Sequence, residues 1–264
     1  MLLAPPASGV PTSFNRWHQD SGRYLSLLHE MQRLRGRVYL QDGAIRESSL
    51  IDGRHQSHLD ESSWHLLVLN AQNRVCGCAR FHQHSRPAIL HELTAARCAL
   101  ARNPEWRDTF LSALRSELAF SASLGLPVVE LGGWALGEEV RGTTEALRIA
   151  LGTYAFWQML GNAVCISTAT RRHCASSILR RIGGRVLACG GVDLPSYYDP
   201  QYDCEMEVLK FYSWAPNPRY TPWVDQLKDE LSQISVIARH SGSIDLPAHA
   251  REDWMSFTAC AKTA

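Results

Sequence analysis

Apolar residues recur at helical spacing near the start of the chain. Between residues 23 and 39 they form one stripe, made of Tyr24, Leu27, Leu28, Met31, Leu34 and Val38. The segments 64–70 and 74–82 are predicted strands, and the short polar turn at 72–73 between them predicts a β-hairpin. The intervening residues 40–63 are polar and show no clear period.

Helices and strands alternate through the rest of the chain. The pattern predicts a helix within 103–124, a strand at 127–136, a helix at about 144–160, a strand at 163–169, a helix at 171–183, strands in 185–194 and 204–214 joined by a loop at 195–203, and a helix at 223–234. Gly132 and Gly133 interrupt the strand 127–136, which indicates a β-bulge or a close backbone approach. This order predicts one α/β (α+β) domain over residues 21–236, with a mixed sheet flanked by helices. Residues 1–20 are expected to be a disordered lead-in, and residues 237–264 a weakly ordered tail.

One apolar segment has the length of a membrane span. Residues 149–170 carry no charge, but Gly161 and Asn162 break the segment, and its polar side chains would lack partners in lipid. A buried helix followed by a buried strand explains the segment better. We therefore expect no membrane span.

Composition narrows the class of protein. The 264 residues carry a formal net charge of +1, which gives no indication of a nucleic-acid partner. The eight cysteines show no framework spacing, and the first residues do not resemble a secretory leader. We therefore expect reduced thiols and a cytoplasmic protein.

One face of the strand 74–82 carries unusual chemistry. Cys76, Cys78, Arg80, His82 and His84 alternate along it. The C-x-C and H-x-H pairs suggest metal ligands, but in a strand positions 76 and 84 lie roughly 26 Å apart, at about 3.3 Å per residue. We therefore predict no metal site. A charged Arg80 in the middle of a strand needs a partner or a ligand.

The turn before the second long helix has the features of an anion site. Residues 137–147 read GEEVRGTTEAL, with Arg141, Gly142, Thr143 and Thr144 at the junction between strand and helix. Free backbone N–H groups at a helix N-terminus favour phosphates. The turn has neither the G-x-G-x-x-G nor the G-K-[ST] pattern of nucleotide sites. Capping of the helix by a threonine is the alternative explanation.

This order of strand, R-G turn, helix, strand, and helix ending in two glycines resembles the acyl-donor-binding core of the GNAT acyltransferase superfamily. The segments MQRLRGRVY, SHLDESSWHLLVLN and NRVCGCARF are similar to those of the acyl-homoserine-lactone synthases and N-acyl amino acid synthases. The resemblance covers roughly residues 25–215 and implies a mostly antiparallel sheet. It also implies transfer of an acyl group from a thioester to an amine.

The resemblance assigns roles to particular residues. Substrate binding falls to Arg35, Tyr39 and Asp60, and catalysis to Glu130 and Arg80. The phosphopantetheine arm of an acyl carrier protein, or coenzyme A, would lie along Trp134, Leu136, Arg141, Gly142, Thr143 and Thr144 as a co-substrate, and no cofactor is held permanently. The partners would be a small amine, such as an amino acid, and possibly an acyl carrier protein.

The chain departs from the family pattern at four positions. Ile45 lies near the place of a tryptophan, Ser57 replaces an acidic residue, Gly133 an arginine, and Leu179 the tyrosine that protonates the leaving thiolate in many GNAT enzymes. These departures leave the acceptor open. The alternative functions are an acetyl-coenzyme A-dependent N-acetyltransferase and a non-catalytic protein that binds an acyl thioester or a partner.

Several candidate residues also have a purely structural explanation. Glu130 has Arg80 as a possible ion-pair partner across the sheet, and Arg35, Asp60 and Arg80 are together consistent with a structural ion-pair network. The aromatic residues Tyr154, Phe156 and Trp157 fit a packed core better than an acyl pocket. The loop 195–203 either covers the substrate or only connects two strands.

Overall fold

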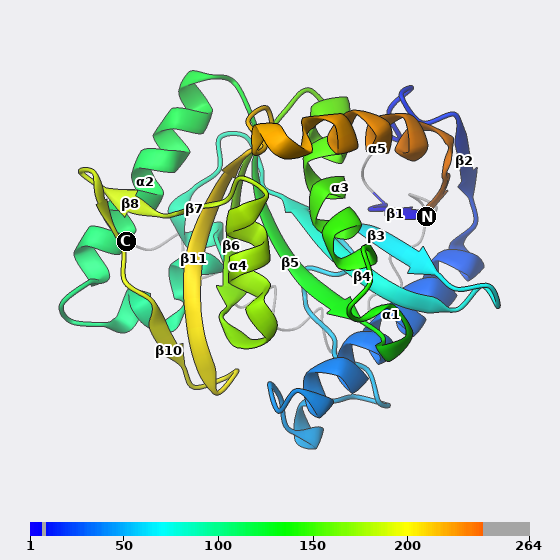
Figure 1. Ribbon diagram of the computed structural model, residues 1–264, viewed down its shortest axis with the longest axis horizontal. Helices are drawn as coiled ribbons and strands as arrows, with labels where there is room; N and C mark the ends of the chain where they lie inside the picture. Colours follow the sequence, from blue (N-terminus) through cyan, green and yellow to red (C-terminus); the bar gives the residue numbers. More distant parts are fainter. Residues whose placement is uncertain (7–8, 240–264) are drawn as a thin grey trace, which may run out of the picture.

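The centre of the protein is one large sheet (Figure 1). The computed structural model describes residues 1–6 and 9–239. The strands are β1 (Leu2–Ala4), β2 (Arg16–Gln19), β3 (Trp64–Leu69), β4 (Val75–Gln83), β5 (Val128–Leu136), β6 (Val164–Thr170), β7 (Arg185–Val186), β8 (Ala188–Cys189), β9 (Val192–Asp193), β10 (Tyr197–Asp199), β11 (Cys204–Tyr212) and β12 (Ser235–Ala238). The main sheet has ten strands in the order β10-β11-β6-β5-β4-β3-β1-β12-β2, with β7 also paired to β11.

The sheet is mixed and mostly antiparallel, as the resemblance implies. Only β5 with β6, β1 with β12, and β12 with β2 run parallel. The helix between β5 and β6 makes the parallel step possible, because a parallel pair needs a long crossover. The predicted hairpin is confirmed by the antiparallel pair β3–β4.

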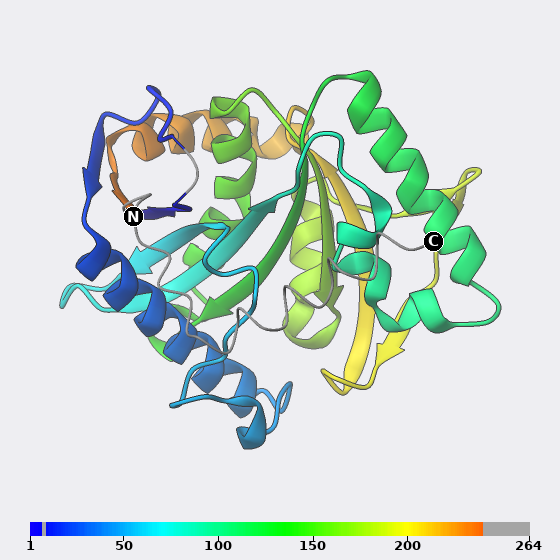
Figure 2. The ribbon, with the colours of Figure 1, turned by 180° about the vertical axis from the view of Figure 1, so that it is seen from behind.

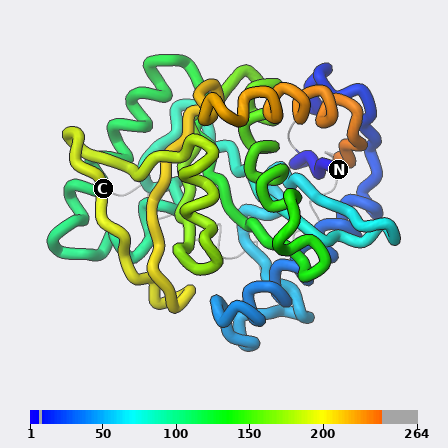
Figure 3. Tube along the Cα trace, viewed as in Figure 1, coloured from blue at the N-terminus to red at the C-terminus, as the bar shows by residue number. Residues whose placement is uncertain are grey.

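Among the described residues, five α-helices flank the sheet in two layers (Figures 1 and 2). They are α1 (Ser21–Gln41), α2 (Arg107–Ser123), α3 (Glu145–Met159), α4 (Ala175–Arg181) and α5 (Thr221–Gln233). Short 3₁₀ turns lie at η1 (Glu47–Ser49), η2 (Leu90–Glu92), η3 (Ala95–Arg97), η4 (Ala99–Arg102), η5 (Glu138–Val140), η6 (Arg172–Cys174) and η7 (Pro218–Tyr220). Helices α3, α4 and α5 cover one face, with α3 and α5 side by side (Figure 3), and α1 and α2 cover the other face.

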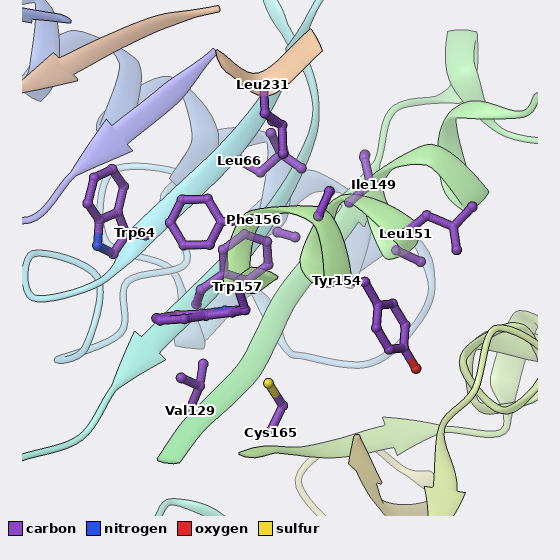
Figure 4. Packing of buried hydrophobic residues seen from close by; sticks show 14 of the residues in the cluster. Trp64, Leu66, Val129, Ile149, Leu151, Tyr154, Phe156, Trp157, Cys165 and Leu231 are labelled. Carbon is purple, nitrogen blue, oxygen red and sulfur yellow. The ribbon is translucent and has the colours of Figure 1, made fainter. Parts of the chain in front are cut away.

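The largest core cluster lies between the sheet and the layer of α3 and α5. Trp64, Phe156 and Trp157 meet in it, with Tyr154 farther along α3 (Figure 4). The three aromatic side chains of α3 are at most 1% exposed. Their interpretation as core residues is therefore confirmed, and none of them lines the cavity described below.

The segment with the length of a membrane span divides where its glycine predicts. Helix α3 ends at Met159, Gly161 has a φ of +89°, and β6 begins at Val164. Among the described residues, no helix combines the length and the apolar character that crossing a membrane requires.

The expectation of a disordered lead-in at residues 1–20 is wrong for two segments. Strand β1 is completely buried and is hydrogen-bonded between β3 and β12, while β2 pairs with β12 at the edge of the sheet. Strand β12 comes from residues 235–238, so the pairing that orders both segments is remote in sequence. Most of the predicted C-terminal tail, residues 240–264, lies outside the described residues.

Candidate active site

The two parallel strands at the centre of the sheet separate part-way along their length. Strand β5 pairs with β6 only from Val128 to Leu131, opposite Val164 to Ser167. Beyond these residues β5 continues along β4, and β6 continues along β11. In Figure 1, β5 runs to the lower right, away from the lower part of β11, which lies to its left. The result is a V-shaped opening within the sheet.

A cavity of about 520 Å³ lies at this opening. Helix α1 contributes to its wall from one face of the sheet, and α3 and α4 contribute from the other. The loop 195–203 also reaches it, because Tyr202 lines the cavity. The cavity is therefore in contact with both layers of helices.

A β-bulge shapes the β5 side of the opening. Cys78 pairs with Ala135 and Arg80 with Gly132, so Gly133 and Trp134 together lie opposite the single residue Ala79. The bulge predicted from the two glycines is thus confirmed. It places Trp134 and Leu136 on the cavity wall.

The bulge requires a glycine at position 133. Gly133 has a φ of +62°, a conformation that residues with a side chain rarely adopt. A Cβ atom there would lie 3.2 Å from Arg35 Nη1 and 3.2 Å from Arg80 Cβ. An arginine, as the resemblance would have it, would be strained at this position and would press against Arg35 and Arg80.

Asp60 is the centre of a buried ion-pair network on the α1 side. Its carboxylate accepts hydrogen bonds from Arg35, at 3.0 Å and 2.5 Å, from Arg80 at 3.3 Å and from Gln32 at 3.0 Å. Arg35 and Asp60 are each 1% exposed. Burial alone would raise the pKa of Asp60, but the hydrogen bond and charge of Arg35 hold that pKa well below its usual range. The predicted association of Arg35, Asp60 and Arg80 is confirmed.

Arg80 retains hydrogen-bonding capacity beyond this network. Its Nη1 donates to Asp60, while its Nε has no partner among the described residues. Its side chain lines the cavity, and so does Tyr39, whose hydroxyl donates to the Trp134 carbonyl at 3.4 Å. A guanidinium group at a cavity wall is suited to bind a carboxylate.

Glu130 does not pair with Arg80. Its carboxylate accepts hydrogen bonds from His84 Nε2 at 2.9 Å and from the backbone N–H groups of Thr94 and Ala95 at 2.8 Å and 2.7 Å. Burial alone would raise the pKa of Glu130, but these three hydrogen bonds lower it. Glu130 also lines the cavity and is therefore an ionised carboxylate at its wall.

His84 is the partner that the sequence did not reveal. Its alternation with His82 suggested only a metal pair, and each histidine instead has a protein partner: Glu130 for His84, and Ser63 Oγ at 3.1 Å for His82 Nδ1. Within the described ranges, no group of three or more residues is arranged to hold a metal ion. A histidine just after β4 and a carboxylate on the neighbouring β5 were the features of the sequence that could have indicated this pair.

The turn after β5 has the open backbone expected of an anion site. Gly142 has a φ of +72°, and no atom would contact a Cβ placed there within 4 Å. The Thr143 hydroxyl accepts from the Glu145 N–H at 3.2 Å, so threonine capping is also present. Thr144, at the N-cap position, makes no capping bond. The N–H groups that follow Glu145 therefore remain available at the start of α3.

The guanidinium group of Arg141 contacts a residue that the sequence did not single out. Arg141 Nη2 donates to both carboxylate oxygens of Asp42, at 3.1 Å and 3.2 Å, and Arg141 Nε donates to the Leu136 carbonyl at 3.1 Å. Asp42 follows the last residue of α1. From the turn after β6, His173 Nε2 lies 3.4 Å from the same carboxylate.

No family model matches this sequence, and no curated protein matches it in sequence. Solved structures do resemble it. A coenzyme A-dependent acyl-homoserine lactone synthase, BjaI, determined with SAM and isopentyl-CoA, is 18% identical, with a TM-score of 0.50 over 96% of this chain and 99% of that chain. FeeM, an N-acyl amino acid synthase from uncultured soil microbes, is 12% identical, with a TM-score of 0.46 over 69% and 83% of the two chains.

The comparison with BjaI spans nearly the full length of both chains. The aligned part of this chain contains nearly all of the mostly antiparallel sheet and the helices on both of its faces. The chain therefore has the GNAT-like fold of the acyl-homoserine lactone synthases.

Proposed function

We propose that this protein is an N-acyltransferase that moves an acyl group from a thioester to the amine of a small molecule such as an amino acid. The observation that carries the proposal is the cavity at the V-shaped opening, which both helix layers line. An acyl thioester entering from the α3 side and an amine entering from the α1 side would meet at β5. Acyl-homoserine lactone and N-acyl amino acid synthases, named among the similar structures, perform reactions of this class.

The donor would lie along the bulge and the turn after β5. Its phosphate would bind near Arg141, Gly142, Thr143 and Thr144, and its pantetheine arm would lie along Trp134 and Leu136, on the part of β5 beyond its pairing with β6. The open backbone at Gly142 and the N–H groups that follow Glu145 at the start of α3 support this placement. Both an acyl carrier protein and coenzyme A present such an arm, so either is a suitable donor, and neither remains bound between turnovers.

The acyl chain would occupy the apolar part of the cavity. The wall on the side of α3 and α4 is made largely of aliphatic side chains: Ala146, Ile149, Ala150, Ile178 and Leu179. Ile166 and Met206 extend it along β6 and β11. This lining favours a chain longer than acetyl, because each buried methylene contributes about 0.8 kcal/mol.

The acceptor would be held on the other side by Arg80. Asp60 holds one edge of the Arg80 guanidinium group through Nη1, and the Arg80 side chain lines the cavity. A carboxylate next to the reacting amine would pair with the positive charge of Arg80. An amino acid carries both groups on one carbon atom, which makes it a suitable acceptor.

The chemistry requires removal of a proton from the amine. The amine nitrogen attacks the thioester carbonyl carbon, the C–N bond forms, and the C–S bond breaks as the tetrahedral intermediate collapses. Glu130 is an ionised carboxylate at the cavity wall. Because its lowered pKa makes it a weak base, we assign it to accept the proton through a water molecule. The proton taken from the amine is then passed to the departing thiolate. Leu179, at the position of the usual tyrosine, cannot supply one.

The experiment measures free thiol release from acyl carrier protein and coenzyme A thioesters of several chain lengths, mixed with pooled amines. Arg80→Gln is expected to lower kcat/KM for the acceptor by about 100-fold, the effect of losing a charged hydrogen bond of up to about 3 kcal/mol. Arg74→Gln is the matched control, because Arg74 is 74% exposed and lies outside this cavity.

The absence of turnover with every donor would contradict the proposal. One observation favours a non-catalytic alternative, since all three hydrogen-bond donors to Glu130 belong to the protein itself. Glu130→Gln separates the two functions. A catalyst would lose rate with little change in donor affinity, whereas a binding protein would keep both its affinity and its biological effect.

A further inference from the structure

The two sides of the V-shaped opening are joined at its mouth by one carboxylate. The turn after β5 reaches Asp42 through Arg141, and the turn after β6 reaches it through His173. Asp42 belongs to neither turn, because it follows the end of α1 on the other face of the sheet. Asp42, Arg141 and His173 all line the cavity.

The positions of these groups are not equally fixed. Arg172, next to His173, donates one hydrogen bond to the Asp42 carbonyl and one to the Asp203 carbonyl, and so anchors the main chain of Asp42. The Asp42 side chain is 17% exposed. The side chains of Arg141 and His173 are 36% and 62% exposed and end in solvent-accessible positions. Exposed ion pairs of this kind contribute little to stability, so their partners exchange easily.

The carboxylate of Asp42 already pairs with Arg141, the cationic group that a donor phosphate would need. Arg141 is the only arginine in the turn 137–147, which also carries Glu138, Glu139 and Glu145. A phosphate approaching the start of α3 would therefore meet acidic side chains and one arginine that is already paired. A phosphate has more negative charge than a carboxylate and more acceptor oxygens, and it can also accept from the backbone N–H groups of α3.

We propose that Asp42 is an internal substitute for the donor phosphate. In the free protein its carboxylate holds Arg141 and His173 together across the mouth of the opening. A donor phosphate takes over Arg141 and His173, while Arg172 keeps the main chain of Asp42 in place. Asp42 thereby lowers the affinity for phosphate-bearing donors and sets a threshold for their entry. This inference rests on the proposed function, because it uses the same donor site.

The experiment measures binding by titration calorimetry with coenzyme A, 4′-phosphopantetheine and pantetheine, which lacks a phosphate. Asp42→Asn preserves shape and removes the competing charge. It is expected to tighten coenzyme A and 4′-phosphopantetheine binding by about three- to tenfold and to leave pantetheine unchanged. In an Arg141→Gln background the same substitution should have no effect, because the group that Asp42 occupies is gone.

Glu138→Gln is the matched control. It removes one negative charge from the turn that carries Arg141. The Glu138 carboxylate, however, contacts Gln41 Nε2 at 3.4 Å and not the Arg141 guanidinium group. A general electrostatic effect would improve phosphate binding equally in both variants, and that result would overturn the proposal.

Two further results would also decide the matter. If coenzyme A binds the unaltered protein and Asp42→Asn binds it no more tightly, the role of Asp42 is wrong and the donor site stands. If neither phosphate-bearing probe binds any of the variants, the donor site itself is wrong, and the role of Asp42 falls with it. Thermal unfolding of each variant, compared with the unaltered protein, shows whether the fold is intact.

Discussion

Asp60 is the residue on which two arginines of the site depend. It lies between Arg35 and Arg80 with its carboxylate almost completely removed from water. The sequence predicted these three residues together from a resemblance, but not which of them is central. Their pairing joins α1, the polar segment 40–63 and β4, and only the fold brings those parts together.

Asp60→Asn is expected to destabilise the protein by about 3–5 kcal/mol, because it leaves the buried guanidinium group of Arg35 and the partly buried one of Arg80 without a charged partner. Urea unfolding measures the change. Asp52→Asn is the control, since Asp52 is 78% exposed in its pair with Arg54 and should contribute less than about 1 kcal/mol. Equal effects of the two substitutions would show that the buried network is not a stabilising element.

Glu130 illustrates the limit of prediction for a single residue. The sequence placed a carboxylate on the strand before the turn and left Arg80 as its possible partner. The structure pairs it with His84 and with two backbone N–H groups beside η3 instead. Which partner a charged residue finds across a sheet depends on the register of β4 with β5, and the β-bulge sets that register.

At the scale of elements, the bulge in β5 was the most informative prediction. Two adjacent glycines inside a strand pattern are rare without a structural reason, so the interruption could be located from the sequence. Its consequence could not be predicted, because the atoms that a side chain at position 133 would meet belong to Arg35 and Arg80, on two other elements.

Gly133→Ala tests how tightly the bulge is packed. Its positive φ and the two contacts at 3.2 Å predict a loss of about 2 kcal/mol in unfolding free energy, larger than the cost of the φ angle alone. Gly125→Ala has a similar φ of +64° but open space around it, and should cost about 1 kcal/mol. Losses of the same size would mean that the contacts at position 133 relax freely.

At the scale of the whole molecule, segments from the two ends of the described chain complete one side of the sheet. Strand β1 lies between β3 and β12, and β12 also pairs with β2. The proline- and glycine-containing segment 1–20 suggested disorder, because neither of its strands is recognisable without its partner.

Leu3→Ala is expected to destabilise the protein by about 2–5 kcal/mol, since Leu3 is completely buried and its truncation leaves a cavity. A disordered lead-in would predict no change in the denaturation midpoint. Leu124→Ala provides the comparison at a position 47% exposed, where the expected change is about 0.5 kcal/mol or less.

The sequence by itself determined the succession of helices and strands from α1 to α5, the bulge, the open turn before α3 and several of the residues that line the cavity. These features depend on local periodicity, backbone preference and glycine, which act over a few residues. Only the tertiary structure decided that β5 and β6 separate, that β1 and β12 complete the sheet, and that Asp42 meets Arg141. Those results depend on contacts between residues up to more than two hundred positions apart, whose energies exist only once the chain has folded.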